Sequence, residues 1–212
     1  MDSVTSFIYG MSMMFFSMMA FLFWRKGKEM LFRMIMWLMI VVDLQLVKDM
    51  VFFLIYGFDN EHAWYLTSSL DMMIIPFYSF VLMELVKPGW FRWVKALMLE
   101  LPFLLLPVFY IFTHNIIWFY VLSVWGAIYG CSTFILLIFM IRRYHRQLKE
   151  RFSYQEKINL NWLLAILNTF FLILFLWTLS CFVINVDYDN IYMVSSLILW
   201  MLIDYFVYSM SQ

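Results

Sequence analysis

Seven long apolar stretches constrain this chain more than any other feature of its sequence. They cover about residues 4–24, 31–57, 64–86, 94–112, 116–141, 158–184 and 191–210. Each is close to or above the ~20 residues that an α-helix needs to cross a hydrocarbon core of ~30 Å. The strict alternation of a membrane β-barrel is absent. The sequence therefore predicts an all-α membrane protein, a single domain over residues 1–212 that forms a bundle of seven transmembrane helices.

The composition supports this prediction and argues against a catalytic or metal-dependent role. Hydrophobic residues make up 66% of the 212 positions, whereas soluble domains average roughly 45–50%. Cys131 and Cys181 are expected at different depths, which does not favour a disulfide. His62, His114 and His145 are predicted in separate connections and give no metal site. Because H-E-x-x-H, G-x-S-x-G and P-loop motifs are missing, we expect no enzyme activity and no cofactor.

Thirteen of the fourteen Lys and Arg residues lie in alternate connections between the apolar stretches, which predicts the orientation. Lys and Arg number four in residues 25–33, three in 87–95 and six in 142–157, with none in 1–3, 58–63, 113–115 or 185–190. Connections rich in Lys and Arg stay in the cytoplasm. The sequence thus predicts an N-terminus outside, a C-terminus in the cytoplasm and the lipid bilayer as the main partner.

Charged residues inside the predicted spans need a partner or a cavity, because lipid does not solvate them. The second span carries Asp43, Lys48 and Asp49, and the third carries Asp71 at a depth similar to that of Lys48. These residues predict either a ligand or proton site or an ion pair that only holds helices together. Asp204 in the seventh span is expected near the depth of Asp43, where the two acids could share a proton. The alternative is a contact between Asp204 and a Tyr or Ser hydroxyl.

Four further polar residues are candidates for structural roles. Glu84 precedes Lys87 by three residues, which favours an ion pair at a turn. Glu100 lies in the fourth span, where we expect it to meet backbone groups or a nearby basic residue. Ser153 and Glu156 match a capping box, in which each side chain bonds the other's backbone N–H, just before the sixth span.

Three strings in the sequence resemble a known group of membrane domains. They are DMMIIPFYSFVLMELVKPGW (71–90), ELPF (100–103) and RFSYQEKINLNWL (151–163). These strings resemble the N-terminal multi-pass membrane domain of bacterial signalling proteins, whose output is an AraC-type helix-turn-helix domain or a sensor histidine kinase. The resemblance covers essentially the whole chain. Because the chain stops at Gln212, directly after the seventh span, the output module is expected to be missing from it.

The resemblance implies a sensory, signal-transducing domain in the bacterial inner (cytoplasmic) membrane. Such a domain receives a small-molecule or membrane stimulus and passes the signal to a cytoplasmic output domain, which is either a transcription regulator or a kinase. We expect a homodimer through the cytoplasmic continuation and no direct nucleic-acid binding by this chain. A small-solute or ion transporter or channel is the alternative, because it too would use the intramembrane Asp and Lys residues.

Overall fold

The computed structural model describes residues 3–27, 29–57, 60–151, 161–183 and 185–209, and the regular secondary structure in these ranges is entirely helical. The elements are α1 (Ser3–Lys26), α2 (Met30–Tyr56), α3 (Glu61–Asp71), η1 (Met72–Ile74), α4 (Ile75–Val86), α5 (Trp93–Thr113), α6 (Ile116–Arg151), α7 (Asn161–Phe182) and α8 (Val186–Ser209). The predicted all-helical fold is therefore confirmed.

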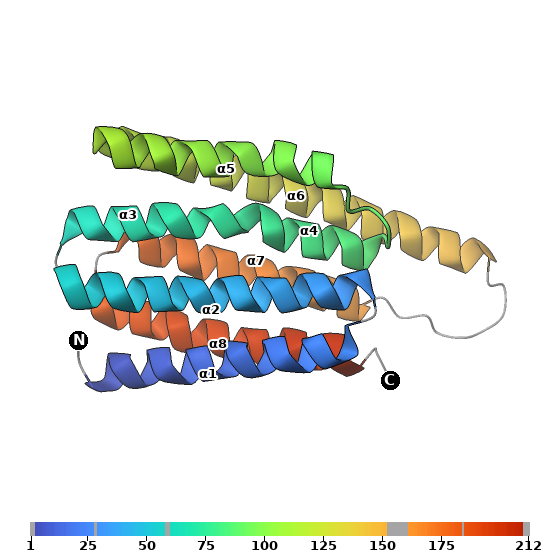
Figure 1. Cartoon of the computed structure of the whole chain (residues 1–212). Helices are drawn as coiled ribbons and strands as arrows, with labels where there is room; N and C mark the ends of the chain where they lie inside the picture. The colour runs from blue at the N-terminus through green and yellow to red at the C-terminus, as the bar shows by residue number, and fades with distance from the viewer. Residues whose placement is uncertain (1–2, 28, 58–59, 152–160, 184, 210–212) are drawn as a thin grey trace.

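The helices lie side by side as an elongated bundle (Figure 1). At what we name the N-terminal end of the bundle, α1, α3, α6 and α8 begin. At the opposite end, α1, α4 and α8 finish, and α6 continues beyond its neighbours. Helix α1 packs mainly on α2, α7 on α8, and α5 on α6. The α5–α6 pair forms an outer layer on one side, and the α3–η1–α4 rod lies between this layer and α2.

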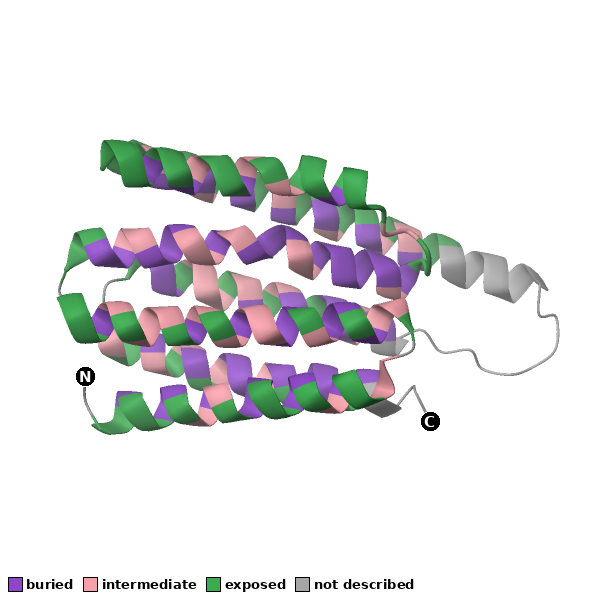
Figure 2. Cartoon of the chain, in the orientation of Figure 1, coloured by how far each residue is buried: buried purple, intermediate pink, exposed green. Residues whose placement is uncertain are grey.

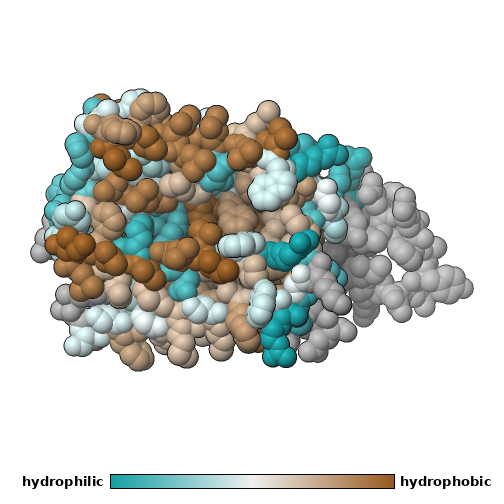
Figure 3. Space-filling model, in the orientation of Figure 1, coloured by the Kyte–Doolittle hydropathy of each residue, from teal (hydrophilic) through white to brown (hydrophobic). Residues whose placement is uncertain are grey.

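Five helical segments are long enough and apolar enough to cross a membrane. They are Ser3–Lys26, Glu61–Val86, Trp93–Thr113, Ile116–Arg143 and Leu163–Phe182. Helices α2 and α8 have 27 and 24 residues, a comparable length, and they carry most of the charged side chains predicted inside spans. Figure 3 shows hydrophobic surface over the middle of the viewed face, with hydrophilic residues mainly toward its ends and a smaller hydrophilic patch over α2 and α3.

Helix boundaries agree with the predicted spans to within a few residues at most ends. Helix α6 continues past its predicted span to Arg151, in agreement with the helical extension to about Lys149 that the sequence predicts. The largest difference is in α8, which begins at Val186 rather than near 191. Asp187 and Asp189 therefore lie in the first turn of α8, where acidic groups stabilise a helix, and not in a connection as predicted. The predicted capping-box residues Ser153 and Glu156 lie outside the described residues.

The third predicted span is interrupted in its middle by the short 3₁₀ turn η1. Pro76 lies in the first turn of α4, where it has no N–H to donate to the carbonyl of Met72, four residues earlier. The chain tightens over Met72–Ile74 before the α-helix resumes. Asp71 is therefore the last residue of α3, at the break in the rod.

Buried side chains are concentrated on the helices at the centre of the bundle. Phe23, Leu38 and Met39 are fully buried where α1 and α2 pack. Figure 2 shows that α4 is buried around much of its circumference, whereas α5 is largely exposed. The polar residues predicted inside spans thus have an interior to face, and it lies among α2, the α3–η1–α4 rod, α7 and α8.

Candidate functional site

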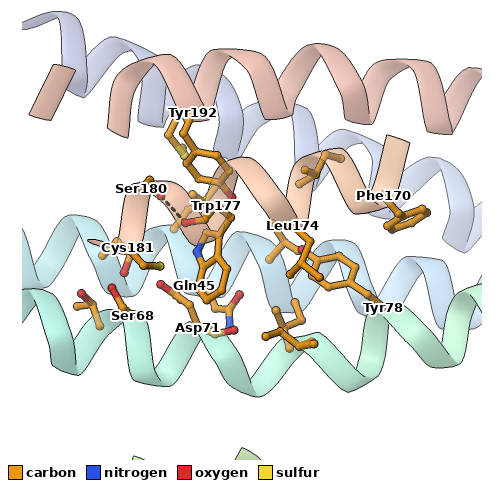
Figure 4. A pocket seen from close by; sticks show the side chains of 18 of the residues that line it. Gln45, Ser68, Asp71, Tyr78, Phe170, Leu174, Trp177, Ser180, Cys181 and Tyr192 are labelled. Carbon is orange, nitrogen blue, oxygen red and sulfur yellow. Dashed lines mark hydrogen bonds between the residues drawn. The ribbon is translucent and has the colours of Figure 1, made fainter. Parts of the chain in front are cut away.

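A cavity of about 120 Å³ lies in the centre of the bundle. Its wall combines aromatic rings with polar side chains from α1, α2, α3, α4, α6, α7 and α8. Figure 4 shows Asp71 and Gln45 pointing toward the Trp177 indole, with Tyr78 and Tyr192 on other parts of the wall. An apolar pocket with a few convergent polar groups is the usual form of a small-molecule site.

The ion pair predicted for Lys48 is present beside this cavity. Lys48 Nζ lies 2.8 Å from Asp49 Oδ1 and 2.7 Å from Asp71 Oδ1. The same ammonium donates to the Thr67 carbonyl at 3.0 Å. These contacts tie α2 to α3 just before the break, and the hydrogen bonds among them go to Asp71 and Thr67, whereas Asp49 Oδ1 has no hydrogen-bond partner among the described residues. Gln45 Nε2 adds a longer hydrogen bond of 3.4 Å to the Asp71 carbonyl.

A third acidic residue, Asp189, also lines the cavity. Its side chain is buried, and its Oδ2 accepts a hydrogen bond of 3.1 Å from the Tyr9 hydroxyl. One residue further on, Asn190 Nδ2 donates to Thr5 Oγ1 at 3.0 Å, a second tie between α8 and α1. Sequence reasoning missed Asp189, because it placed the residue in an external connection. An acidic residue one turn before Tyr192 and Met193 was the signal that could have found it.

The cavity wall is rich in negative charge. Asp49, Asp71 and Asp189 are the carboxylates that line it, and Lys48 is the cation that contacts two of them. Within the described residues, no Lys or Arg forms part of the lining itself. Carboxylates removed from water need a counter-charge or hydrogen-bond donors, so this site is suited to hold a cationic or hydrogen-bond-donating group.

Neither contact predicted for Asp204, with Asp43 or with a Tyr or Ser hydroxyl, is present among the described residues. Asp43 Oδ2 instead accepts a hydrogen bond of 2.5 Å from Ser17 Oγ on α1. Asp204 is 3% exposed, and neither of its carboxylate oxygens has a partner among the described residues. The early start of α8 explains the error: Asp204 lies 18 residues after Val186, about 27 Å along the helix axis and therefore deeper than predicted.

Glu84 and Glu100 also differ from their predicted contacts. Instead of pairing with Lys87, the buried Glu84 carboxylate accepts the backbone N–H groups of Gly89 at 2.6 Å and Phe91 at 2.9 Å. It therefore closes the turn between α4 and α5, where Gly89 has a φ of 81° that favours glycine. Glu100 makes no ion pair among the described residues.

Two histidines predicted to be separate meet at the N-terminal end of the bundle. His62 Nε2 and His114 Nδ1 are 3.0 Å apart, and the Tyr110 hydroxyl is 2.9 Å from His62 Nδ1. The described residues contain no group of three or more His, Cys, Asp or Glu side chains that could hold a metal ion. Cys131 and Cys181 are free thiols. The histidine contact joins α3 to the end of α5 and belongs to a different region from the cavity.

Comparisons with known proteins add no identity to this geometry. No known protein-family model matches the chain, and neither a curated protein nor a solved structure is significantly similar to it.

Proposed function

We propose that this chain is the membrane-embedded sensory domain of a bacterial signalling protein and that its stimulus is a small molecule bound in the central cavity. One observation carries the proposal. Helix α8, the last helix, supplies Asp189, Tyr192 and Met193 to the cavity wall and continues to the opposite end of the bundle. A ligand in the cavity therefore contacts the helix that would lead to a cytoplasmic output domain.

The proposal includes seven spans in the bacterial inner membrane, with the N-terminal end of the bundle outside. Successive spans run in opposite directions between the two ends of the bundle. The basic stretches 25–33 and 87–95 and the end of α6 lie together at the end opposite to the N-terminal end. Lys and Arg are retained on the cytoplasmic side. The proposal also includes a homodimer that forms through the cytoplasmic continuation of the chain.

Reporter fusions test this orientation. A reporter joined after Gln212 should be active only as a cytoplasmic fusion, and one inserted at Asn60 only as an external fusion. The insertion site is close to the N-cap of α3, where Asn60 Oδ1 accepts the Ala63 N–H at 3.1 Å, so membrane abundance must be measured for each fusion. The reverse pattern would overturn the proposed orientation.

The mechanism requires that the ligand bind two arrangements of α8 with different affinities, since equal affinity shifts no equilibrium. The hydrogen bonds Tyr9–Asp189 and Thr5–Asn190 hold the first turn of α8 on α1. A ligand that competes for Asp189 would loosen one of these ties. Movement at the first turn would then be carried along the rigid helix to its far end.

A cavity-filling substitution separates ligand sensing from general damage. Gly130 lines the cavity, and an added Cβ would lie 3.4 Å from Leu174 Cδ2. Gly130→Leu should therefore occupy the space that a ligand needs. Gly10→Leu is the matched control, because a Cβ at Gly10 meets nothing within 4 Å.

The experiment uses the purified chain in lipid nanodiscs. Neutral, cationic and anionic compounds of about one ring in size are screened for an increase in thermal stability. Nitroxide labels on the exposed Cys131 and on Leu202→Cys, with Cys181→Ser, then report the distance between α6 and α8. We expect a compound that stabilises wild type and Gly10→Leu but not Gly130→Leu, and that changes this distance. Binding without any change in the distance would argue against sensing.

A transporter is the second candidate, and one observation favours it. The α3–η1–α4 rod is broken at Asp71 on the cavity wall, and broken helices often form the substrate sites of transporters. Such folds usually break two helices in corresponding halves, whereas η1 is the only 3₁₀ break in the described helices. Accumulation of the stabilising compound inside proteoliposomes would favour transport over sensing.

A further inference from the structure

We propose that the ligand of the central cavity is a small organic cation, with an ammonium group held by Asp189 and a body of about one ring packed against the aromatic wall. This inference rests on the proposed ligand-binding role of the cavity and specifies the chemical class of ligand. It draws on three observations: the unequal pairing of the three carboxylates, the aromatic rings beside them and the size of the space.

The pairing of the carboxylates leaves Asp189 without a cation. Asp49 and Asp71 share the ammonium of Lys48 at 2.8 and 2.7 Å. Lys48 also donates to the Thr67 carbonyl at 3.0 Å, so its ammonium is engaged by groups of α2 and α3. Asp189 is 9% exposed, and it accepts a hydrogen bond from the neutral hydroxyl of Tyr9. A buried carboxylate that makes no ion pair among the described residues is the position that a cationic ligand would complete.

The aromatic wall is suited to the same kind of ligand. Trp177, Tyr78 and Tyr192 stand around the space that Figure 4 shows, and Tyr9 lies at the Asp189 carboxylate. The faces of aromatic rings attract cations, and the attraction strengthens where water is excluded. The rings also offer apolar surface to the body of the ligand. Anionic ligands are disfavoured, because no Lys or Arg among the described residues lines the cavity.

The size of the cavity limits the ligand to about one ring. Its volume is about 120 Å³, and an engineered apolar cavity of roughly 150 Å³ in another protein takes up benzene. Lipids, nucleotides and peptides are much larger than this space. A primary ammonium on a benzyl-sized body fits the charge, the aromatic lining and the volume together.

Two probes of the same shape and different charge test the inference. Benzylammonium and benzyl alcohol are titrated into the nanodisc-embedded chain, and binding is measured by calorimetry. We expect wild type to bind benzylammonium at least tenfold more tightly than benzyl alcohol. Asp189→Asn should remove this preference while keeping a side-chain oxygen to accept the Tyr9 hydroxyl. Asp189→Glu, which restores the negative charge, should restore most of the preference.

Asp187→Asn is the matched control, because Asp187 is an exposed acid in the same first turn of α8 and does not line the cavity. It should bind benzylammonium as wild type does. Equal binding of the two probes to wild type, or unchanged benzylammonium binding to Asp189→Asn, would overturn the ligand class. The proposed function would still stand in that case if Gly130→Leu blocked a neutral compound. Failure of both probes to bind wild type would reject the benzyl-sized cation and leave the sensing role to the compound screen.

Discussion

The α3–η1–α4 rod and the helices of the α5–α6 hairpin are all long and apolar but differ in how far they are buried. In the apolar 18-residue window of Glu61–Val86, 67% of the residues are buried, whereas the corresponding windows of Trp93–Thr113 and Ile116–Arg143 are 22% and 28% buried. All three segments are apolar enough to cross a membrane. Hydropathy therefore identifies the spans but does not distinguish a central helix from a peripheral one.

The polar residues make the distinction that hydropathy does not. The rod carries the buried hydroxyls of Ser69 and Ser79 and the carboxylate of Asp71, all facing other helices. Helix α5 instead exposes Trp93, Leu97 and Phe112. In a bilayer, polar groups must be satisfied inside the protein, while a lipid-facing helix can be apolar all round. The comparison teaches that polar positions indicate which helices surround the cavity.

The largest predicted difference in stability between the two regions comes from replacing a lysine in each of them. Lys48→Met leaves Asp49 and Asp71 without their cation, and breaking a buried pair typically costs about 3–5 kcal/mol. Lys95→Met on α5 should cost only about 0.5–1 kcal/mol, because Lys95 Nζ lies over the Trp90 ring, 5.7 Å from its centroid. Thermal unfolding in a mild detergent measures both effects.

A double substitution shows whether the Lys48 effect comes from the ion pair. Lys48→Met combined with Asp71→Leu should recover part of the lost stability, because replacing both partners with apolar groups is often neutral. Asp49 stays unpaired in the double variant, so the recovery should be incomplete. An additive loss in the double variant would mean that the two residues stabilise the fold independently.

Removal of a buried acid should increase the stability of the protein, whereas removal of Lys48 should decrease it. Asp204 is buried, with no partner for either carboxylate oxygen among the described residues. A charged side chain at the centre of a span costs about 2.5–3.5 kcal/mol on insertion scales. Asp204→Leu should therefore stabilise the protein by about 2.5 kcal/mol. The matched change in the peripheral layer, Glu100→Leu, should stabilise less, because Glu100 is only half-buried.

The Asp204 prediction also separates a functional acid from a structural one. If Asp204→Leu stabilises the fold and abolishes a ligand-induced change in the α6–α8 distance, the residue is kept for signalling at the expense of stability. If it destabilises the fold, the carboxylate has a structural role that the described contacts do not include. Thermal unfolding of Asp204→Leu and Glu100→Leu is measured at the same detergent concentration, without chemical denaturant, so that the two stabilities can be compared.

A smaller loss is expected where the rod turns into the hairpin. Glu84 accepts two backbone N–H groups, from Gly89 and Phe91. Glu84→Gln retains one acceptor oxygen and loses the charge, and hydrogen bonds to charged groups contribute about 1.5–3 kcal/mol each. We expect a loss near 1.5 kcal/mol in thermal unfolding. Glu29→Gln is the control, because the Glu29 side chain makes no capping hydrogen bond at the start of α2.

The sequence was sufficient for the helical fold and for the Lys48 ion pair. Depth along a helix follows from the rise per residue, and neighbours along the chain usually pack together. Helices α2 and α3 are such neighbours, so equal depth placed Lys48 near Asp71. Asp43 and Asp204 show where the method fails, because α2 and α8 are distant in sequence and the start of α8 was misplaced.

The sequence alone did not show which helices lie next to each other around the bundle. Asp189 enters the cavity because α8 begins earlier than predicted and packs on α1 through Tyr9 and Thr5. His62 and His114 meet because α5 packs beside α3. The break after Asp71 could have been predicted from Pro76, since a proline removes the hydrogen bond to the carbonyl four residues earlier.

The smallest predicted effect concerns the contact that joins the two regions at the N-terminal end of the bundle. Tyr110 of α5 is 2% exposed, and its hydroxyl lies 2.9 Å from His62 Nδ1 of α3. Tyr110→Phe removes this hydrogen bond and preserves the ring packing, so it should cost about 1 kcal/mol.

Tyr120→Phe is the matched control for this change, because Tyr120 is 46% exposed and its hydroxyl makes no hydrogen bond among the described residues. Hydrogen exchange should show faster opening of α5 in Tyr110→Phe than in Tyr120→Phe, with little change in α2 and α8. Equal exchange in both variants would mean that apolar packing alone holds the hairpin to the rod. Faster exchange throughout the bundle would mean that the two regions unfold as one unit, and that the hairpin is as necessary to the fold as the other helices of the bundle.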